Sequence, residues 1–255
     1  RAGEKMIVLQ AKDLTISFGG QKVFDEISLA INEKERIGLV GVNGSGKTTL
    51  LKCLTKELEP DKGDIYISSQ TTFAYLEQLP DYDVEKTAWD IVMDSFEELL
   101  TMRQELRELE LKMTSADEEE LVKIMYKYAQ VTETYEINNG YLCESMAEKI
   151  LTGLGFTEEE YSRPIKSFSG GQKTRLNIAR LLAIEPDILY LDEPTNHLDM
   201  SSVEWLEEHL QNYKGTIIVV SHDRMLLDKI ATRILELSHN KLYSYPGNYS
   251  NYLKL

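Results

Sequence analysis

The most constraining feature of the sequence is the segment from residue 41 to residue 48, Gly-Val-Asn-Gly-Ser-Gly-Lys-Thr. It matches the pattern G-x-x-x-x-G-K-[ST] at every defined position. The glycines let the backbone curl around phosphates with its N–H groups inward, while Lys47 supplies a positive charge and Thr48 a hydroxyl for Mg²⁺. The segment therefore predicts a nucleoside triphosphate site. Its predicted nucleotide-binding residues are Gly41, Asn43, Gly44, Ser45, Gly46, Lys47, Thr48 and Thr49.

The residues on either side of this loop support the prediction. Residues 36–40 form an apolar run typical of a buried strand, and residues 48–54 have the spacing of a helix with one apolar face. The N-terminus of that helix would direct its partial positive charge at the phosphates. A glycine-rich turn without a ligand is the alternative, and the strand–loop–helix context disfavours it.

Composition limits the class of protein. The 255 residues are 42% hydrophobic, enough for one large domain or two closely joined subdomains. No apolar run approaches the roughly 18–20 residues that cross a bilayer, and no segment near the N-terminus resembles a signal peptide, so we expect a cytoplasmic protein. Residues 1–5, before Met6, are interpreted as an expression remnant or a natural upstream extension.

Charge and cysteine content exclude other classes. The net charge of −15 argues against a protein that grips nucleic acid with its whole surface, although local contacts remain open. Cys53 and Cys143 lie in different segments without paired-ligand spacing. We therefore expect neither a disulfide framework nor a zinc or iron–sulfur site.

The segments around the phosphate loop contain two further candidates. Residues 6–32 alternate between apolar and polar around Gly19-Gly20, which predicts an antiparallel sheet. Phe18, just before that turn, could stack on an adenine ring if it is exposed; the alternative is an ordinary core residue. Residues 64–67 and 72–76 are predicted strands. Gln78, which follows them, could reach a metal-bound water through its amide oxygen, although a solvent-facing Gln is commoner.

Residues 85–136 differ in character from the rest of the chain. They contain 14 acidic and 6 basic residues, and their apolar positions recur at intervals of three, four or seven. This pattern predicts two long amphipathic helices with a break at residues 114–118, where Ser115 and Glu118 have capping-box spacing. The simplest arrangement is an antiparallel helical hairpin. Its charges form either a solvated face or a docking surface.

A second chemical cluster follows two predicted strands. Residues 188–191 form a continuous apolar run that ends in Asp192 and Glu193, and residues 216–220 are followed by His222 two positions later. In a nucleotide-binding sheet, Asp192 could hold the Mg²⁺ shell and Glu193 could polarise the attacking water. His222 could sense or stabilise the γ-phosphate. We therefore predict Glu193 and His222 as catalytic residues, and Thr48, Gln78 and Asp192 as metal-site residues.

The segment Phe168-Ser169-Gly170-Gly171-Gln172, with a predicted helix over 173–183, resembles the signature of ATP-binding-cassette (ABC) ATPases. Phe168 replaces the usual leucine. The resemblance implies that Phe18 stacks on adenine, that Gln78 senses Mg²⁺ and the γ-phosphate, and that Asp192, Glu193 and His222 act as stated above. It also implies that residues 198–199 form the loop between half-sites. The residues implied to contact the ATP of a partner cassette are Ser169, Gly170, Gly171 and Gln172.

Within that superfamily the chain resembles the first cassette of ABC-F proteins. The pair Asn196-His197, the helical insertion between Gln78 and Phe168, and the tail at residues 245–252 carry this resemblance. It implies ATP and Mg²⁺ as cofactors and a second cassette, in the same chain or in a homodimer, but no membrane domain. It also implies an ATP-driven switch on the ribosome, as a translation factor or an antibiotic-protection factor.

Three other classes of protein contain parts of this pattern. The ATPase domain of a membrane ABC transporter is the first, and the helical insertion and the Asn196-His197 pair argue against it. A coiled-coil chromosome-maintenance ATPase would need far longer heptad segments than residues 85–136 supply. A structural ATP-binding module without turnover is difficult to reconcile with Glu193 and His222.

The predicted fold is an α/β P-loop NTPase of the ABC cassette type. It combines a mainly parallel core, an antiparallel β subdomain, and a helical subdomain with an inserted helical hairpin arm. Residues 6–84 are expected to form the β subdomain and the phosphate-loop part of the core, and residues 85–140 the arm. Residues 141–183 are expected to form the helical subdomain with the signature, and residues 184–255 the rest of the core.

Overall fold

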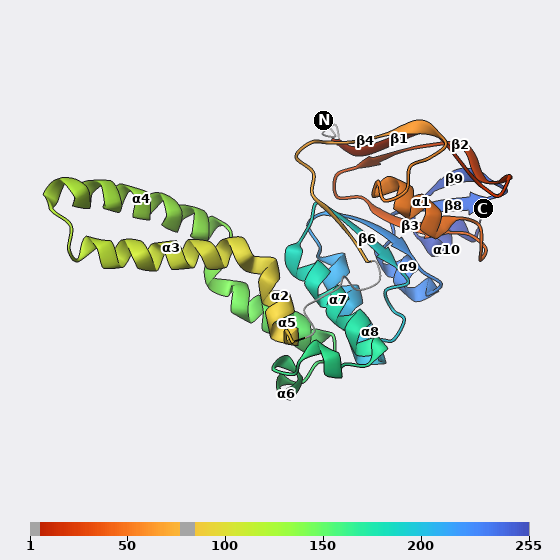
Figure 1. Ribbon diagram of the computed structural model, residues 1–255. Helices are drawn as coiled ribbons and strands as arrows, with labels where there is room; N and C mark the ends of the chain where they lie inside the picture. Colours follow the sequence, from red (N-terminus) through yellow and green to blue (C-terminus); the bar gives the residue numbers. More distant parts are fainter. Residues whose placement is uncertain (1–5, 77–84, 255) are drawn as a thin grey trace. The chain divides into compact units, whose positions relative to one another are not determined.

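The computed structural model describes residues 6–76 and 85–254 (Figure 1). The chain divides into two compact units: residues 1–80 with 185–255, and residues 81–184. Among the residues that the structure describes, every strand lies in the first unit, and the regular secondary structure of the second unit is helical. The units differ because the alternating and continuous apolar runs lie in the first, whereas the helical periodicity of residues 85–136 lies in the second.

An antiparallel sheet of three strands forms one layer of the first unit. Its order is β2-β1-β4, with β1 at Ile7–Phe18, β2 at Gln21–Asn32 and β4 at Lys62–Ile67. The turn from β1 to β2 places Gly19 at φ 56° and Gly20 at φ 80°. Two successive positive φ angles match the twist of a two-residue hairpin, and glycine adopts them without steric strain. The predicted antiparallel sheet is confirmed.

A six-stranded sheet forms the second layer of this unit, in the order β5-β6-β7-β3-β8-β9. All neighbouring strands are parallel except β8 and β9. The central strands β3, β6 and β7 are almost entirely buried, as their continuous apolar sequences require. The strand bounds are Arg36–Val40 for β3, Phe73–Tyr75 for β5, Ile188–Asp192 for β6, Thr216–Val220 for β7, Arg233–Ser238 for β8 and Lys241–Pro246 for β9.

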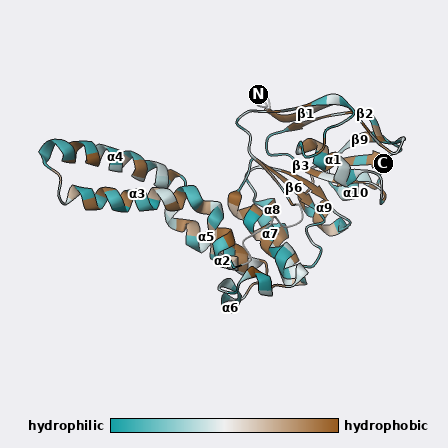
Figure 2. Cartoon of the chain, viewed as in Figure 1, coloured by the Kyte–Doolittle hydropathy of each residue, from teal (hydrophilic) through white to brown (hydrophobic). Residues whose placement is uncertain are grey.

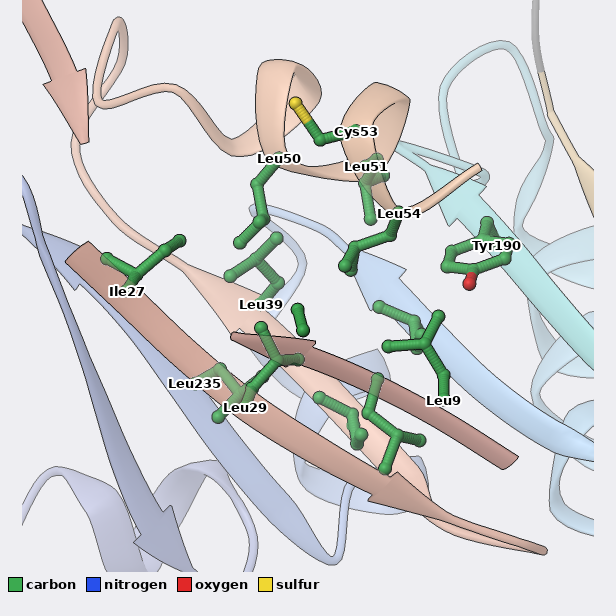
Figure 3. Packing of buried hydrophobic residues seen from close by; sticks show 14 of the residues in the cluster. Leu9, Ile27, Leu29, Leu39, Leu50, Leu51, Cys53, Leu54, Tyr190 and Leu235 are labelled. Atoms are coloured by element: carbon green, nitrogen blue, oxygen red, sulfur yellow. The ribbon is translucent and has the colours of Figure 1, made fainter. Parts of the chain in front are cut away.

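Helix α1 (Lys47–Leu54) contributes one face to the core between these layers. Figure 3 shows Leu50, Leu51 and Leu54 of this helix directed at Leu9 of β1 and Leu39 of β3. These five leucines are at most 1% exposed. At about 1.5–3 kcal/mol for each fully buried side chain, this packing holds the helix, and therefore the loop before it, firmly against the sheet.

Three more helices complete the first unit. Helix α9 (Arg224–Ile230) covers β3 so closely that a Cβ on Gly38 would lie 3.0 Å from Leu227 Cδ2. Helix α8 (Met200–Gln211) packs against α9, and α10 (Tyr249–Tyr252) lies near the end of the chain. The parallel sheet is thus covered on the side opposite α1 as well.

The second unit is built from helices joined by short 3₁₀ turns at residues 94–96, 140–142 and 165–167. Helix α2 packs against α5 and α7, so the residues just before the hairpin belong with the helices that follow it. The helix bounds are Ala88–Met93 for α2, Glu97–Met113 for α3, Glu118–Ile137 for α4, Cys143–Gly153 for α5, Glu158–Tyr161 for α6 and Gly170–Ile184 for α7.

Helices α3 and α4 form the predicted hairpin, and from here on the arm means these two helices and their connection, residues 97–137 within the segment 85–140. Leu106 and Leu109 of α3 and Ile124 and Tyr135 of α4 are the buried side chains of these helices. Figure 2 shows short hydrophobic patches separated by hydrophilic segments along both helices. The capping-box expectation was wrong: Asp117, not Ser115, caps α4 by accepting from Glu120 N at 2.9 Å. A carboxylate one residue before the helix competes better for that N–H than a more distant hydroxyl.

The fold class predicted from the sequence is confirmed: a mainly parallel sheet, an antiparallel sheet and a helical subdomain are all present. None of the helices within residues 6–76 and 85–254 combines the length and apolar character needed to cross a bilayer.

Candidate nucleotide site

The candidate site lies where the parallel strands of the first unit end. Strand β3 ends at Val40, directly before the phosphate loop, and β6 ends at Asp192. Strand β7 ends at Val220, two residues before His222. Because β3, β7 and β6 are adjacent and parallel, their carboxyl ends meet at one edge of the sheet. Residues far apart in the sequence therefore converge there.

The conformation of the phosphate loop depends on its glycines. Gly46 precedes α1 at φ 100°, and a Cβ there would lie 2.3 Å from Val23 Cγ1. Gly44 has φ 80°, and a Cβ there would meet no atom within 4 Å. Position 46 thus needs glycine for close packing against β2, and position 44 needs it for its backbone angle. No side chain caps α1, so the N–H groups of its first turn stay available to an anion.

Lys47 and Ser45 are two of the polar residues of the loop. Lys47 Nζ donates to the carbonyl oxygens of Gly41 at 2.9 Å and Val42 at 3.1 Å, so the ammonium is turned into the loop. Ser45 Oγ is buried without a hydrogen-bond partner. A buried, unpaired hydroxyl is unfavourable unless a ligand completes it, and a phosphate oxygen has the matching acceptor chemistry.

Thr48 and Asp192 bring the predicted metal-site oxygens together. Thr48 Oγ1 donates to Asp192 Oδ2 at 2.8 Å, although the two residues are 144 positions apart. A hydroxyl and a carboxylate beside a phosphate cradle are the oxygen ligands that Mg²⁺ accepts, usually with several waters retained. These two residues therefore fit the ion. The other predicted metal-site residue, Gln78, lies outside the described residues.

Glu193 and His222 form a pair next to this oxygen cluster. Glu193 Oε2 accepts from the backbone N–H of His222 at 3.1 Å, and Glu193 Oε1 lies 3.6 Å from His222 Nε2. Glu193 Oε1 is buried without a hydrogen-bond partner. The Glu193 backbone has φ 48°, an uncommon angle for a non-glycine residue, and its N–H donates to Val220 O at 2.8 Å. One carboxylate oxygen is thus fixed, and the other can accept a proton.

Two cavities adjoin the phosphate loop. One has a volume of about 490 Å³ and includes Lys47, Asn43 and His222 in its lining. The other has a volume of about 300 Å³ and is lined by Phe18, Gly44 and other residues. Phe18 is 54% exposed, so it is not a core residue and its ring is available to a ligand. The loop is therefore bordered by one cavity that includes His222 and another that includes Phe18.

The signature segment begins α7 in the second unit. Ser169 Oγ accepts from Gln172 N at 3.3 Å, while Gln172 Oε1 accepts from Ser169 N at 3.0 Å. This reciprocal pair is a capping box, and a Cβ on Gly170 would meet no atom within 4 Å. Helix α7 begins at Gly170, earlier than the predicted start at residue 173. The signature therefore lies in the first helical turn, where backbone N–H groups can bind an anion.

The unusual aromatic residue of the signature has a packing role. Phe168 is 6% exposed and stacks on Phe156 with ring centroids 5.8 Å apart. The guanidinium of Arg163 lies 5.1 Å from the Phe168 ring centroid. The ring is therefore buried against Phe156 and gains a cation–π contact with Arg163.

The structure also places residues at the site that sequence reasoning missed. Arg224 and Tyr252 line the larger cavity, and His239 and Asn240 line the smaller one. The only signal for the last two was the Ser-His-Asn sequence between two apolar runs, which is typical of a tight turn. The residues implied for the loop between half-sites precede α8, and Asp199 caps that helix by accepting from Ser202 N at 2.9 Å.

Comparisons with known proteins agree with this geometry. The family model described as ABC transporter matches residues 24–196. The chain is 42% identical, over 97% of its length, to the ATP-binding protein YdiF of Bacillus subtilis. It is 35% identical over 96% of its length to the tylosin resistance ATP-binding protein TlrC of Streptomyces fradiae. It is 37% identical over 98% to the ABC transporter F family member 4 of Arabidopsis thaliana.

The chain spans only part of each of these relatives, covering 39% of YdiF, 45% of TlrC and 35% of the Arabidopsis protein. Among solved structures, the ATP-binding subunit of an ABC transporter matches 94% of this chain and 90% of its own with a TM-score of 0.68. At 20% identity this similarity establishes the fold alone. Together with the family match, it leads to one conclusion: the chain belongs to the ABC transporter family and is one of its ATP-binding cassettes.

Proposed function

We propose that the chain is the first ATP-binding and hydrolysing cassette of a cytoplasmic ABC-F protein that acts on the ribosome together with a second cassette. The observation that carries the ATPase part is the convergence of four elements at one sheet edge. These are the open phosphate loop, the Thr48–Asp192 contact, the unpaired Oε1 of Glu193 and the adjacent His222.

ATP binding would place the β- and γ-phosphates in the loop at residues 41–48. The N–H groups at the start of α1 and the ammonium of Lys47 would offset their charge, with Lys47 exchanging loop carbonyl oxygens for phosphate oxygens. Thr48 and Asp192 would hold Mg²⁺, which neutralises developing charge on the phosphates. The ring of Phe18 would stack on adenine.

Glu193 is suited to act on the attacking water. Its Oε2 is fixed by the backbone of His222, so Oε1 can accept a hydrogen bond and then a proton from a water in line with the γ-phosphorus. The water oxygen bonds to that phosphorus as the bond to the bridging oxygen breaks, and ADP leaves. The Nε2 of His222, 3.6 Å from Oε1, is placed to hold the same water or a γ-phosphate oxygen.

A second cassette would complete each site. In the signature turn the capping box takes the backbone N–H groups of Ser169 and Gln172. The N–H groups of Gly170 and Gly171, in the first turn of α7, would therefore be the donors to a ligand. In a two-cassette arrangement each signature would close over the other cassette's ATP. The partial coverage of YdiF and the other relatives supports a longer parent protein that contains both cassettes.

The ribosome assignment rests on different support. One relative is named as an F family member and another as a tylosin resistance protein, and the arm fits the helical insertion of ABC-F proteins. ATP-dependent closure of two cassettes would then move the arm, or the part of the ribosome that the arm contacts.

Sedimentation tests the ribosome assignment. The two-cassette parent protein with Glu193→Gln, and the equivalent change in the other cassette, should co-sediment with ribosomes in ATP more than in ADP. The hydrolysis-competent protein in ATP is the control. Equal sedimentation with both nucleotides would contradict the ribosome assignment. Co-purification of a membrane domain with the native protein would contradict it as well and would support a transporter ATPase.

A further inference from the structure

The smaller cavity beside the phosphate loop has a wall that neither the loop nor Phe18 provides. Its lining includes Phe18 at the end of β1, Gly44 and Ser45 of the loop, and His239 and Asn240 of the turn between β8 and β9. A volume of about 300 Å³ can admit a nucleobase. His239 and Asn240 of the β8–β9 turn form this wall.

That turn is tied to the hairpin that carries Phe18. The side chain of Asn240 donates to the carbonyl oxygens of Lys22 and Val23, the latter at 2.9 Å. The backbone oxygen of Asn240 accepts from Asp25 N at 2.9 Å. These hydrogen bonds, two from the Asn240 side chain and one from the backbone, fix the turn to the backbone of β2 and so set the position of His239 relative to Phe18.

His239 occupies a demanding position in this turn. His239 and Asn240 are the two central residues of a hairpin that pairs Ser238 with Lys241, and their φ angles are 49° and 61°. Asn-Gly and Asp-Gly fit such a turn best, because a side chain in the left-handed region costs roughly 1–2 kcal/mol. A histidine is thus held in a strained conformation beside a cavity, where it is exposed.

The ring of His239 is oriented by its neighbour. Ser238 Oγ lies 3.0 Å from His239 Nδ1 within hydrogen-bond geometry. One ring nitrogen is therefore occupied, and Nε2 makes no hydrogen bond among those described for residues 6–76 and 85–254. A nucleobase edge offers both donors and acceptors that could pair with it.

We propose that His239 is a nucleobase-contacting residue, which lies with Phe18 in one base pocket and hydrogen-bonds through Nε2 to the edge of the base. Asn240 and Ser238 are positioning residues for it. This inference rests on the proposed nucleotide binding, but it concerns the base alone and makes no claim about the phosphates or hydrolysis.

Calorimetry of the 255-residue chain with two probes tests the inference. MgATP has a base, whereas magnesium tripolyphosphate has only the phosphates. The variant His239→Asn keeps a residue suited to positive φ. It should lower the affinity for MgATP about three- to tenfold and change the affinity for tripolyphosphate less than twofold. The same loss for both probes, or no loss for either, would overturn the proposal.

Two further measurements separate a base contact from a structural effect. His239→Asn should lower the affinity for MgATP by a smaller factor in the Phe18→Ala variant than in the parental chain, because both side chains would contact the same base. Imidazole ¹⁵N signals of His239 should shift with MgATP but not with tripolyphosphate. Lys34→Asn, at φ 59° in a different turn, is the matched control and should leave both affinities unchanged. A parental chain that binds neither probe would instead refute nucleotide binding itself.

Discussion

The nucleotide site and the arm differ in what holds them in place. The phosphate loop is continuous with β3 and α1, and the core behind it contains side chains such as Leu50 and Leu51 that are fully buried. The arm buries few side chains between its helices and relies on surface pairs, including Lys127 with Glu105 at 2.5 Å. Exposed pairs of this kind contribute little stability, typically below about 1 kcal/mol.

This contrast indicates that the two regions have different roles. A catalytic site needs atoms fixed to within a fraction of an ångström, and a dense core supplies that rigidity. The arm instead presents exposed apolar residues on its surface, among them Leu111, Val122, Met125 and Tyr126. Changes near the loop should therefore alter ATP chemistry strongly, and changes in the arm should alter it little.

The largest expected effect is on hydrolysis. In the two-cassette parent protein, Glu193→Gln with the equivalent change in the other cassette should lower the ATPase rate about 10²- to 10⁴-fold and leave ATP bound. The amide is nearly isosteric with the carboxylate but cannot accept the water's proton. Single-turnover kinetics measures the step, with Glu208→Gln, at an exposed carboxylate of α8, as the control. A parental rate in the mutant would disprove the role of Glu193.

The next effect is on binding. Lys47→Ala should lower the affinity for MgATP about 10- to 100-fold, because the phosphates lose one charge-assisted partner while the backbone N–H groups remain. Circular dichroism should show an unchanged fold. Calorimetry compares this variant with Lys52→Ala, a lysine in the last turn of the same helix, which should bind normally. Equal affinities for the two variants would show that the loop is not the site.

Stability should separate the two regions directly. Leu50→Ala in the core should reduce the free energy of unfolding by about 2–5 kcal/mol and weaken ATP binding, since α1 loses its packing. Ile124→Ala, 8% exposed in the arm, should cost about 1–3 kcal/mol and leave ATP affinity unchanged. Leu111→Ala, at a side chain 71% exposed, is the control and should cost less than about 0.5 kcal/mol. An arm variant that impairs ATP binding as much as Leu50→Ala would remove the distinction.

The smallest expected effect is on the rate at which the two cysteines react with a thiol label. Cys53 lies in α1 and Cys143 at the start of α5, and both are buried. Burial and the nearby charge of Asp61 raise the pKa of the Cys53 thiol to about 11, so at pH 8 only roughly one thiol in a thousand would be ionised. Thiol labelling should therefore be slow at Cys53. MgATP should slow it further, because α1 begins at the phosphate loop, but should not change labelling at Cys143. Protection of both cysteines, or of neither, would contradict this expectation.

The sequence predicted the parts of the molecule that follow from short-range pattern. Apolar runs located β3, β6 and β7, and the parallel order of such strands placed Asp192 and His222 beside the phosphate loop. Helical periodicity located the arm. These inferences succeed because one local rule determines each of them.

Other features depend on contacts that no local pattern encodes. The choice of Asp117 over Ser115 as the cap of α4 is decided by where the chain turns. The position of His239 near Phe18 arises from hydrogen bonds between residues more than 200 positions apart. The unpaired Oε1 of Glu193 becomes visible only once the packing around it is known.

The central claim is that this chain supplies half of each ATP site, and one measurement tests it most directly. The specific ATPase rate of the 255-residue chain should be low when it is dilute and monomeric. It should rise with protein concentration or on addition of the second cassette, because association supplies a signature opposite each phosphate loop. Replacement of Ser169 by a bulky residue should abolish that rise without weakening ATP binding. A high rate that stays constant with concentration, in a sample shown to be monomeric, would contradict the shared-site account.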